Sequence, residues 1–253
     1  MRFAVIAGGE GSRLREEGVG VPKPLVDLCG VTLLERLVNI FVSEGAREIV
    51  VAYNERHESV AALLSSLKDR LHDDCGVSLQ CVGVSTPSGM HSLLALSQEL
   101  AGEPFCLTTV DTIFKETDFH RYLQAFRQAL NEGVDALMGV TDFVDDERPL
   151  YVETTDDMKV TAFSDSLPEG LSFVSGGIYG LTAKTLDVLQ TTVDKGEMRM
   201  RCFQRALLTS GLNVRAFRFG KVIDIDHASD ILQAERLVNE DLGDTQGVGK
   251  EKV

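Results

Sequence analysis

The stretch that decides the fold stands near the beginning of the chain and reads Phe3-Ala4-Val5-Ile6-Ala7-Gly8-Gly9-Glu10-Gly11-Ser12-Arg13-Leu14. Its apolar first part is typical of a strand that is buried on both faces. Three glycines come next, and glycines let the backbone curl so that several N–H groups point at one anion. Ser12 adds a hydroxyl donor, and Arg13 adds a planar cation that suits phosphate oxygens. The stretch therefore predicts a buried strand followed by an anion-binding loop.

These glycines match neither of two common phosphate-binding motifs. No Gly-Lys-Ser/Thr comes after them, Leu14 stands where the dinucleotide fingerprint has its third glycine, and we expect no helix to begin there. A flexible turn would explain three glycines alone. A second motif, Pro22-Lys23-Pro24-Leu25, favours a binding site. Because two prolines stiffen its backbone, Lys23 is held at a low entropy cost, which suits the neutralisation of a transferred phosphoryl group.

The rest of the chain continues with strands and helices. Up to residue 140 we expect strands at 48–53, 77–84, 105–110 and 134–140, with helices at 34–41, 55–71, 88–100 and 118–130 between them. Repeated β-α units predict an α/β fold with a Rossmann-like, mixed but mostly parallel central sheet flanked by helices.

The rhythm changes after Thr141. There we expect strands at 151–155, 159–163, 173–180, 213–219 and 222–225, and helices at 182–189, 198–208 and 229–238. We see no convincing linker and expect a single domain over residues 1–241, with a flexible tail at 242–253.

Composition and charge exclude several function classes. The chain has 39 acidic and 25 basic residues, a net charge of −14, which argues against nucleic-acid and anionic-membrane partners. No apolar run approaches the ~20 residues that cross a bilayer. The five cysteines have no Cys-x-x-Cys spacing, so we expect free, mostly buried thiols in a reducing cytoplasm.

The glycine loop (Ala7, Gly8, Gly9, Gly11, Ser12, Arg13, Leu14) and the Pro22–Leu25 motif together resemble the signature of the nucleoside-diphospho-sugar pyrophosphorylases, which are nucleotidyltransferases with a glycosyltransferase-A-like fold. The resemblance spans roughly residues 1–240. It implies a nucleotide-binding half at 1–140 and an acceptor-binding half at 141–241. It also implies a Mg²⁺-dependent transfer from a nucleoside triphosphate to a sugar 1-phosphate.

The resemblance assigns roles to particular residues of the first half. The backbone from Ala7 to Ser12 would hold the triphosphate, Arg13 would bind the departing pyrophosphate, and Lys23 would lie near the reacting phosphorus. Ser88 and Gly89 stand where the family reads its nucleobase, although Ser88 would equally serve as an ordinary helix N-cap.

Two stretches supply the carboxylates that the resemblance assigns to Mg²⁺. Asp111 stands at the end of a predicted strand, where the family usually has Gly-Asp and this chain has Val110-Asp111. Val222-Ile223-Asp224-Ile225-Asp226 resembles the family's late metal-binding strand. Asp224 and Asp226 share a face if they lie on one strand. The alignment favours Asp224 as the second metal ligand, while Asp226, which matches shorter variants of the motif, is an alternative or additional ligand or instead caps the following helix.

The acceptor half matches the family more loosely. Gly176 and Gly177 would admit a sugar ring, or they serve only close sheet packing. Glu153 would bind sugar hydroxyls. The family often has a phosphate-binding lysine where this chain reads Ser164-Asp165-Ser166-Leu167-Pro168, and Lys221 is either its replacement or a surface lysine.

Three functions remain compatible with the sequence. The first is a sugar-1-phosphate nucleotidyltransferase. The second is a CTP-dependent cytidylyltransferase that acts on phosphocholine or another phospho-alcohol, although the absence of Trp gives an aromatic choline cage little support. The third is a nucleotide-sensing module without turnover, against which the intact Arg13, Lys23, Asp111 and Asp224 argue. A homo-oligomer is possible, and the sequence names neither the base nor the acceptor.

Overall fold

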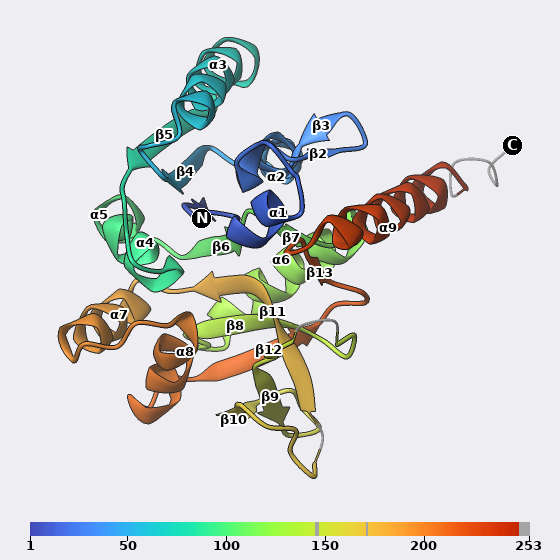
Figure 1. The fold of residues 1–253 in the computed structure, drawn as a ribbon. Coiled ribbons are helices and arrows are strands. Elements are labelled where there is room, and N and C mark those ends of the chain that lie inside the picture. The colour runs from blue at the N-terminus through green and yellow to red at the C-terminus, as the bar shows by residue number, and fades with distance from the viewer. Residues whose placement is uncertain (145–146, 171, 248–253) are drawn as a thin grey trace, which may run out of the picture.

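The central feature of the computed structural model, which describes residues 1–144, 147–170 and 172–247, is a nine-stranded sheet with helices on both faces (Figure 1). Seven strands are arranged in the order β10-β9-β11-β6-β1-β4-β5, and β8 joins β11 to β12. The predicted α/β class with a mixed, helix-flanked sheet is confirmed.

The strands of this sheet agree closely with the predicted segments. They are β1 (Arg2–Ala7), β4 (Glu48–Tyr53), β5 (Ser78–Gly83), β6 (Phe105–Thr109), β8 (Ala136–Thr141), β9 (Tyr151–Thr154), β10 (Val160–Ser164), β11 (Ser172–Leu181) and β12 (Val214–Arg218). Two small two-stranded sheets add β2 (Asp27–Leu28) with β3 (Val31–Thr32), and β7 (Thr112–Ile113) with β13 (Ile223–Asp224).

The helices in the described part of the chain are α1 (Ser12–Glu16), a 3₁₀ turn η1 (Lys23–Leu25), α2 (Leu33–Ser43), α3 (Glu58–Cys75), α4 (Gly89–Ala95), α5 (Ser97–Leu100), α6 (Glu116–Asn131), α7 (Lys184–Asp194), α8 (Met200–Thr209) and α9 (Ala228–Gly247). Thr32 caps α2 as its capping-box spacing predicts, because its hydroxyl accepts the N–H of Glu35.

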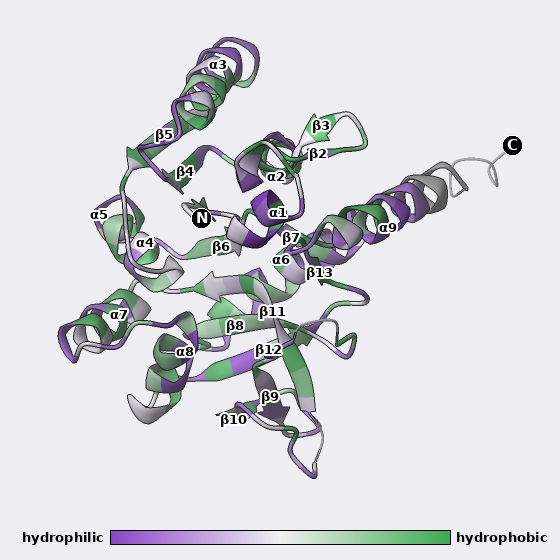
Figure 2. Ribbon diagram, in the orientation of Figure 1, coloured by the Kyte–Doolittle hydropathy of each residue, from purple (hydrophilic) through white to green (hydrophobic). Residues whose placement is uncertain are grey.

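Strand β1 shows how the sequence builds three layers. Phe3 and Val5 pack into one buried cluster with α2, α3, α6 and α9, whereas Ala4 and Ile6 pack into another with α4, α5, α7 and α8. Because successive side chains of a strand point to opposite faces, an all-apolar strand is stable only when helices cover both. Figure 2 shows β6 and β8, two other strands of this sheet, as mainly hydrophobic.

The two halves of the sheet differ in strand direction. In the first half, β6, β1, β4 and β5 run parallel. Strand β11 runs antiparallel to β6, β8 and β9, and its register with β8 shifts between Ser175 and Ile178. Gly177 lies in this irregularity with φ +70°, a conformation that L side chains rarely adopt.

Several expectations need correction. A short helix, α1, does begin at Ser12. The helix expected over 88–100 is broken at Leu96 into α4 and α5, where the Ser97 hydroxyl donates to the Leu94 carbonyl. Helix α9 continues to Gly247, although we expected a flexible tail from residue 242. The remainder of that predicted tail, 248–253, lies outside the described residues.

The cysteines are free, as expected, but only Cys106 is buried, so the prediction of a mostly buried set is wrong. Cys29, Cys75 and Cys81 lie in turns, at helix ends or on an edge strand, where side chains stay exposed. In the ranges that the structure describes, no helix combines the length and the apolar character that crossing a bilayer requires.

Candidate active site

The predicted nucleotide residues gather at the carboxyl ends of the parallel strands. The glycine loop leaves β1, Asp111 comes after β6, and the segment 84–88 leaves β5. Gly8, Gly9, Lys23, Ser88 and Gly89 line one cavity of ≈ 280 Å³, together with Asp111. Parallel strands end at one edge of a sheet, which is where α/β proteins bind ligands. The structure therefore brings the separate sequence motifs together.

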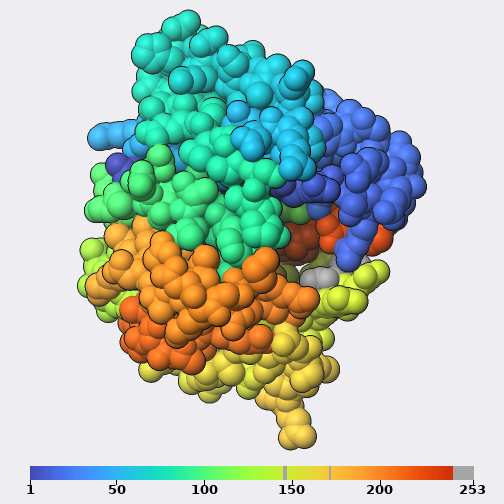
Figure 3. Space-filling view, turned by 60° about the vertical axis from the view of Figure 1, so that its left-hand side comes forward, coloured from blue at the N-terminus to red at the C-terminus, as the bar shows by residue number. Residues whose placement is uncertain are grey.

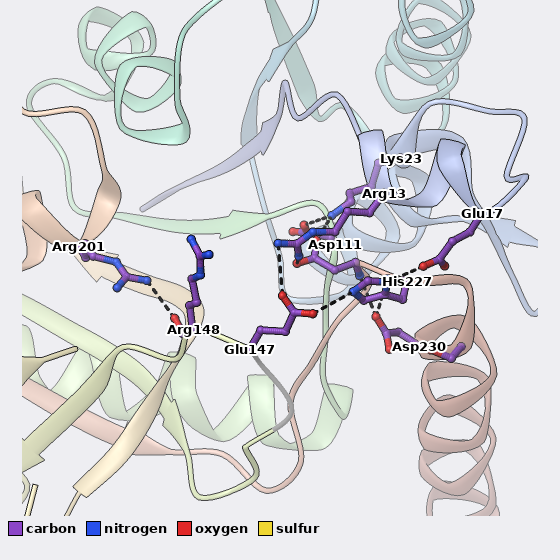
Figure 4. A network of polar contacts seen from close by, with 11 residues as sticks. Arg13, Glu17, Lys23, Asp111, Glu147, Arg148, Arg201, His227 and Asp230 are labelled. Atoms are coloured by element: carbon purple, nitrogen blue, oxygen red, sulfur yellow. Dashed lines mark hydrogen bonds and ion pairs between the residues drawn. The ribbon is translucent and has the colours of Figure 1, made fainter. Parts of the chain in front are cut away.

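Lys23 lies deep in this site, where its ammonium pairs with two carboxylates and the glycine loop packs against it. The side chain is 8% exposed, and its Nζ lies 2.7 Å from Asp111 Oδ2 and 2.7 Å from Asp226 Oδ1 (Figure 4). Gly11 lets the loop approach, because a Cβ there would lie 3.3 Å from the Lys23 Cβ and its φ is +57°. The glycine loop and the Pro-Lys-Pro motif thus pack directly on each other.

The charges of Lys23 and Asp111 stabilise each other. Burial alone would lower the pKa of Lys23, but the carboxylates of Asp111 and Asp226 outweigh it, so the pKa is raised and the ammonium stays charged. Burial alone would raise the pKa of Asp111, but the Lys23 ammonium holds it below its usual value. The site therefore keeps a fixed positive charge beside a fixed negative charge.

Asp224 faces the same space from β13, which pairs with β7. Thr112 donates a hydrogen bond to Asp224 Oδ1 at 3.0 Å and contacts the Thr109 hydroxyl at 2.6 Å. Desolvation by the surrounding protein and then the Asp111 carboxylate raise the pKa of Asp224 to about 7, even though the residue remains open to solvent at the cavity. Such like-charge repulsion is relieved when a cation binds between two carboxylates.

Asp226 behaves differently from the prediction. Strand β13 ends at Asp224, so the two aspartates do not share the face of one strand. The Asp226 carboxylate instead joins Lys23 to Arg13, whose NH1 lies 2.9 Å from Asp226 Oδ2 (Figure 4). Nor does its side chain cap α9: the Asp230 carboxylate accepts the backbone N–H groups of Asp226 and His227.

A second polar cluster closes the site on the side of Arg13. Glu147, from the acceptor half, lies 3.8 Å from Arg13 NH2 and 4.0 Å from the Nε2 of His227. The other ring nitrogen of His227 contacts Glu17, which also accepts the N–H of Ala228. Residues from both halves and from the start of α9 therefore meet around Arg13.

Asp111 and Asp224 fit a Mg²⁺ ion whose remaining ligands come from the substrate phosphates and water. In the described ranges no group of three or more acidic, His or Cys side chains is arranged to hold a metal. Mg²⁺, however, needs only one or two carboxylates when phosphate oxygens and waters complete its shell. Asp111 and Asp224 supply two neighbouring carboxylates, whereas Asp226 is engaged by two cations.

A larger cavity of ≈ 430 Å³ adjoins the nucleotide cavity. Asp111, Thr109 and Ser88 border both cavities. The walls of the larger one further comprise Ser175, Gly177 and Tyr179 of β11, then Leu150, Asp224 and Asp226, and residues 198–201 and Gln204 around the start of α8. Figure 3 shows a recess between the N-terminal segments, in blue, and the segment near residue 200, in orange.

The structure does not bring every predicted residue to these two cavities. Glu153 lies on β9 and accepts a hydrogen bond from Ser164 at 2.8 Å, and it lines neither cavity. Lys221 lies 4.3 Å from the ring centre of Phe143 and also lines neither. Ala7, Gly11, Ser12 and Arg13 of the glycine loop line neither of these two cavities. Gly177 serves close packing as well, since a Cβ would lie 2.6 Å from Thr112 Oγ1.

Sequence reasoning missed several residues that shape the site. Thr109 and Thr112 orient Asp224, and Arg199, Arg201 and Gln204 form the wall at α8. Only the two arginines had a sequence signal, and it was weak. Arg199 and Arg201 stand near the start of a predicted helix, where exposed charged residues are common whether or not they line a site.

Comparisons with known proteins agree with this geometry. A sequence profile of the family described as "MobA-like NTP transferase domain" matches residues 3–164. "Probable mannose-1-phosphate guanylyltransferase 3" of Oryza sativa subsp. japonica is 26% identical over 207 residues, which cover 77% of this chain and 54% of that protein. The chain thus spans about half the length of the curated relatives it matches.

Solved structures show the same fold. A putative glucose-1-phosphate thymidylyltransferase from Bacillus anthracis superposes with a TM-score of 0.77 at 18% identity, over 95% of this chain and 96% of that one. The inositol-1-phosphate CTP transferase from T. maritima superposes with a TM-score of 0.73 at 18% identity, over 94% and 96%. At these identities the likeness establishes the fold.

Proposed function

Because the chain belongs to the family of MobA-like NTP transferase domains, we propose that it transfers a nucleoside monophosphate from a nucleoside triphosphate to a sugar 1-phosphate, giving a nucleoside-diphospho-sugar and pyrophosphate. The observation that carries the proposal is the meeting of two cavities at Asp111, beside the Lys23 ammonium. One cavity is bordered by the glycine loop, and the other is large enough for a small phosphorylated acceptor.

The reaction needs no covalent protein nucleophile. An oxygen of the acceptor phosphate attacks the α-phosphorus of the triphosphate, and the bond from that phosphorus to the bridging α–β oxygen breaks in line with the attack. The electron pair leaves with pyrophosphate. Lys23 balances the negative charge at the reacting phosphorus, and Arg13 balances the charge on pyrophosphate. Catalysis then rests on positioning and preorganised charge.

Asp111 and Asp224 are the residues that would hold Mg²⁺. When bound, the ion supplies positive charge and orients phosphate oxygens. Asp226 holds Arg13 and Lys23 toward the same space until the triphosphate provides their negative partner. The backbone N–H groups of the glycine loop donate hydrogen bonds to the phosphates. They belong to Gly8, Gly9, Gly11 and Ser12.

The sugar 1-phosphate is favoured as acceptor because the curated relative acts, by its name, on mannose 1-phosphate. We retain transfer from CTP to a phospho-alcohol as the alternative function, because a structural neighbour is named an inositol-1-phosphate CTP transferase. Choline receives no support from the larger cavity, because Tyr179 is the only aromatic residue in the described part of its wall. The free cysteines favour a reducing compartment, so the proposal places the reaction in the cytoplasm.

The experiment is a pyrophosphate-release screen with Mg²⁺. Four nucleoside triphosphates are crossed with mannose 1-phosphate, glucose 1-phosphate, inositol 1-phosphate and phosphocholine. The expected result is release that needs both a nucleotide and a sugar 1-phosphate and that disappears in Asp111→Asn. Release with CTP and phosphocholine alone would favour the alternative acceptor. Nucleotide binding without release in any combination would favour the sensing module.

A further inference from the structure

The larger cavity has walls of opposite charge. Its lining includes the carboxylates of Asp111, Asp224 and Asp226, and also Arg199 and Arg201 from around the start of α8. A phosphorylated acceptor brings further negative charge next to these carboxylates. Cations in the cavity wall offset that repulsion, and the arginine guanidinium is the group best suited to phosphate oxygens.

Arg201 is already held in place. Its NH1 forms an ion pair with Asp165. Its NH2 donates to the backbone carbonyl of Arg148 at 3.0 Å, the contact that Figure 4 shows. Asp165 is in turn fixed by Arg205, whose NH2 lies 2.8 Å away. These two arginines hold the pKa of Asp165 below its usual value, so the carboxylate stays charged. A guanidinium has five N–H donors, which leaves Arg201 with donors for a ligand.

Arg199 complements Arg201 from the turn before α8. Its side chain is exposed at the cavity, and in the described ranges it forms no ion pair or side-chain hydrogen bond. The neighbouring wall is neutral and polar, because Gln204 Nε2 donates to Ser175 Oγ at 2.9 Å and both residues line the cavity. Cations and hydroxyl-binding groups therefore lie side by side.

We propose that Arg199 and Arg201 bind the phosphate of the acceptor, a phosphomonoester dianion, and that Asp165 positions Arg201. This inference rests on the proposed function. It also explains the stretch Ser164–Pro168, which has no lysine for the acceptor phosphate. In this chain that stretch carries the carboxylate that orients a cation from α8, so the positive charge is supplied by the helix and not by the strand end.

The test compares Arg199→Gln and Arg201→Gln with Arg215→Gln, a control that removes an arginine ion pair, to Glu132, from outside the cavity. We expect the KM for the acceptor found by the screen to rise about ten- to a hundredfold in the first two variants, the range for a lost hydrogen bond to a charged group. The KM for the nucleotide should not change, and neither KM should change in the control.

Asp165→Asn separates positioning from structure. We expect a smaller rise in the acceptor KM than in Arg201→Gln, with an unchanged kcat and an unchanged melting temperature. A fall in kcat and melting temperature without a change in acceptor KM would show a purely structural role and overturn this part. Arg199 makes no contact that folding depends on, so Arg199→Gln remains informative if other variants unfold.

Failure of the clamp formed by Arg199 and Arg201 and failure of the proposed function have different signatures. If wild-type protein releases no pyrophosphate with any pair, calorimetric binding of mannose 1-phosphate and of inorganic phosphate still tests the clamp. Binding that is weakened in Arg199→Gln and Arg201→Gln but not in Arg215→Gln supports it. Three results would overturn it. They are an unchanged acceptor KM in both variants, equal rises in the acceptor and nucleotide KM, and phosphate binding of the same affinity in both variants as in the wild type.

Discussion

The nucleotide half and the acceptor half are both built from a sheet covered by helices, but they differ in strand direction and therefore in how the sequence places their side chains. In the first half, β1, β4, β5 and β6 are parallel, so the motifs at their carboxyl ends all arrive at one edge. In the second half, β11 is antiparallel to its neighbours and is interrupted next to Gly177. Position in the sequence therefore brings predicted residues together at one cavity more readily in the parallel half than in the mixed half.

The residues themselves show this difference. Gly8, Gly9, Lys23, Gly89 and Asp111 all line the cavity at the ends of the parallel strands. Glu153 and Lys221, assigned to the acceptor site from looser matches, lie outside both cavities. The cavity wall is formed instead by a helix start that carries no motif. Substitutions in both halves, taken here in order of decreasing effect, test how firmly the contrast holds.

Asp111→Asn tests the residue where both halves meet. Because Asp111 pairs with Lys23 and lies between the two cavities, the substitution should lower kcat about 10²–10³-fold, as loss of one preorganised electrostatic group does. Steady-state pyrophosphate release measures it. Asp156→Asn, an exposed change in the turn between β9 and β10, is the matched control. Turnover equal to that of the control would remove Asp111 from the mechanism.

Gly177→Ala tests the irregularity of β11. The added Cβ would lie 2.6 Å from Thr112 Oγ1, and φ is +70°, so we expect a loss of about 2–4 kcal/mol in unfolding free energy. Gly196→Ala has a similar φ of +81° with no atom within 4 Å and should cost about 1–2 kcal/mol. Urea unfolding measures both. Equal losses would mean that Thr112 simply moves away from the new methyl group.

Arg13→Gln tests the exposed edge of the nucleotide half. Arg13 is half exposed and is held by Asp226, so we expect the KM for the nucleoside triphosphate to rise about tenfold, with the acceptor KM unchanged. Arg15→Gln, on the same short helix, is the control, because Arg15 is also exposed but does not share the ion pairs of Arg13 with Asp226 and Glu147. A larger effect on the acceptor than on the nucleotide would assign Arg13 to the other half.

Glu153→Gln and Lys221→Gln should change the kinetics least. Both residues lie outside the two cavities, so each KM should change by less than about twofold, within the usual range for surface substitutions. Steady-state kinetics with both substrates measures this. A tenfold rise in the acceptor KM of either variant would restore the assignment made from the sequence and would weaken the case for the clamp at α8.

The sequence alone determined the layers and one edge of the site. The all-apolar run before Gly8 required helices on both faces. The glycine loop, which we propose binds phosphate, has its place set by the buried parallel strand that precedes it. Only the tertiary structure showed that Asp226 pairs with Arg13 and Lys23, and that Asp165 holds Arg201 at the larger cavity. Those contacts join residues far apart in the chain, and their geometry depends on strand direction, a register shift and the end of a short strand, none of which local periodicity encodes.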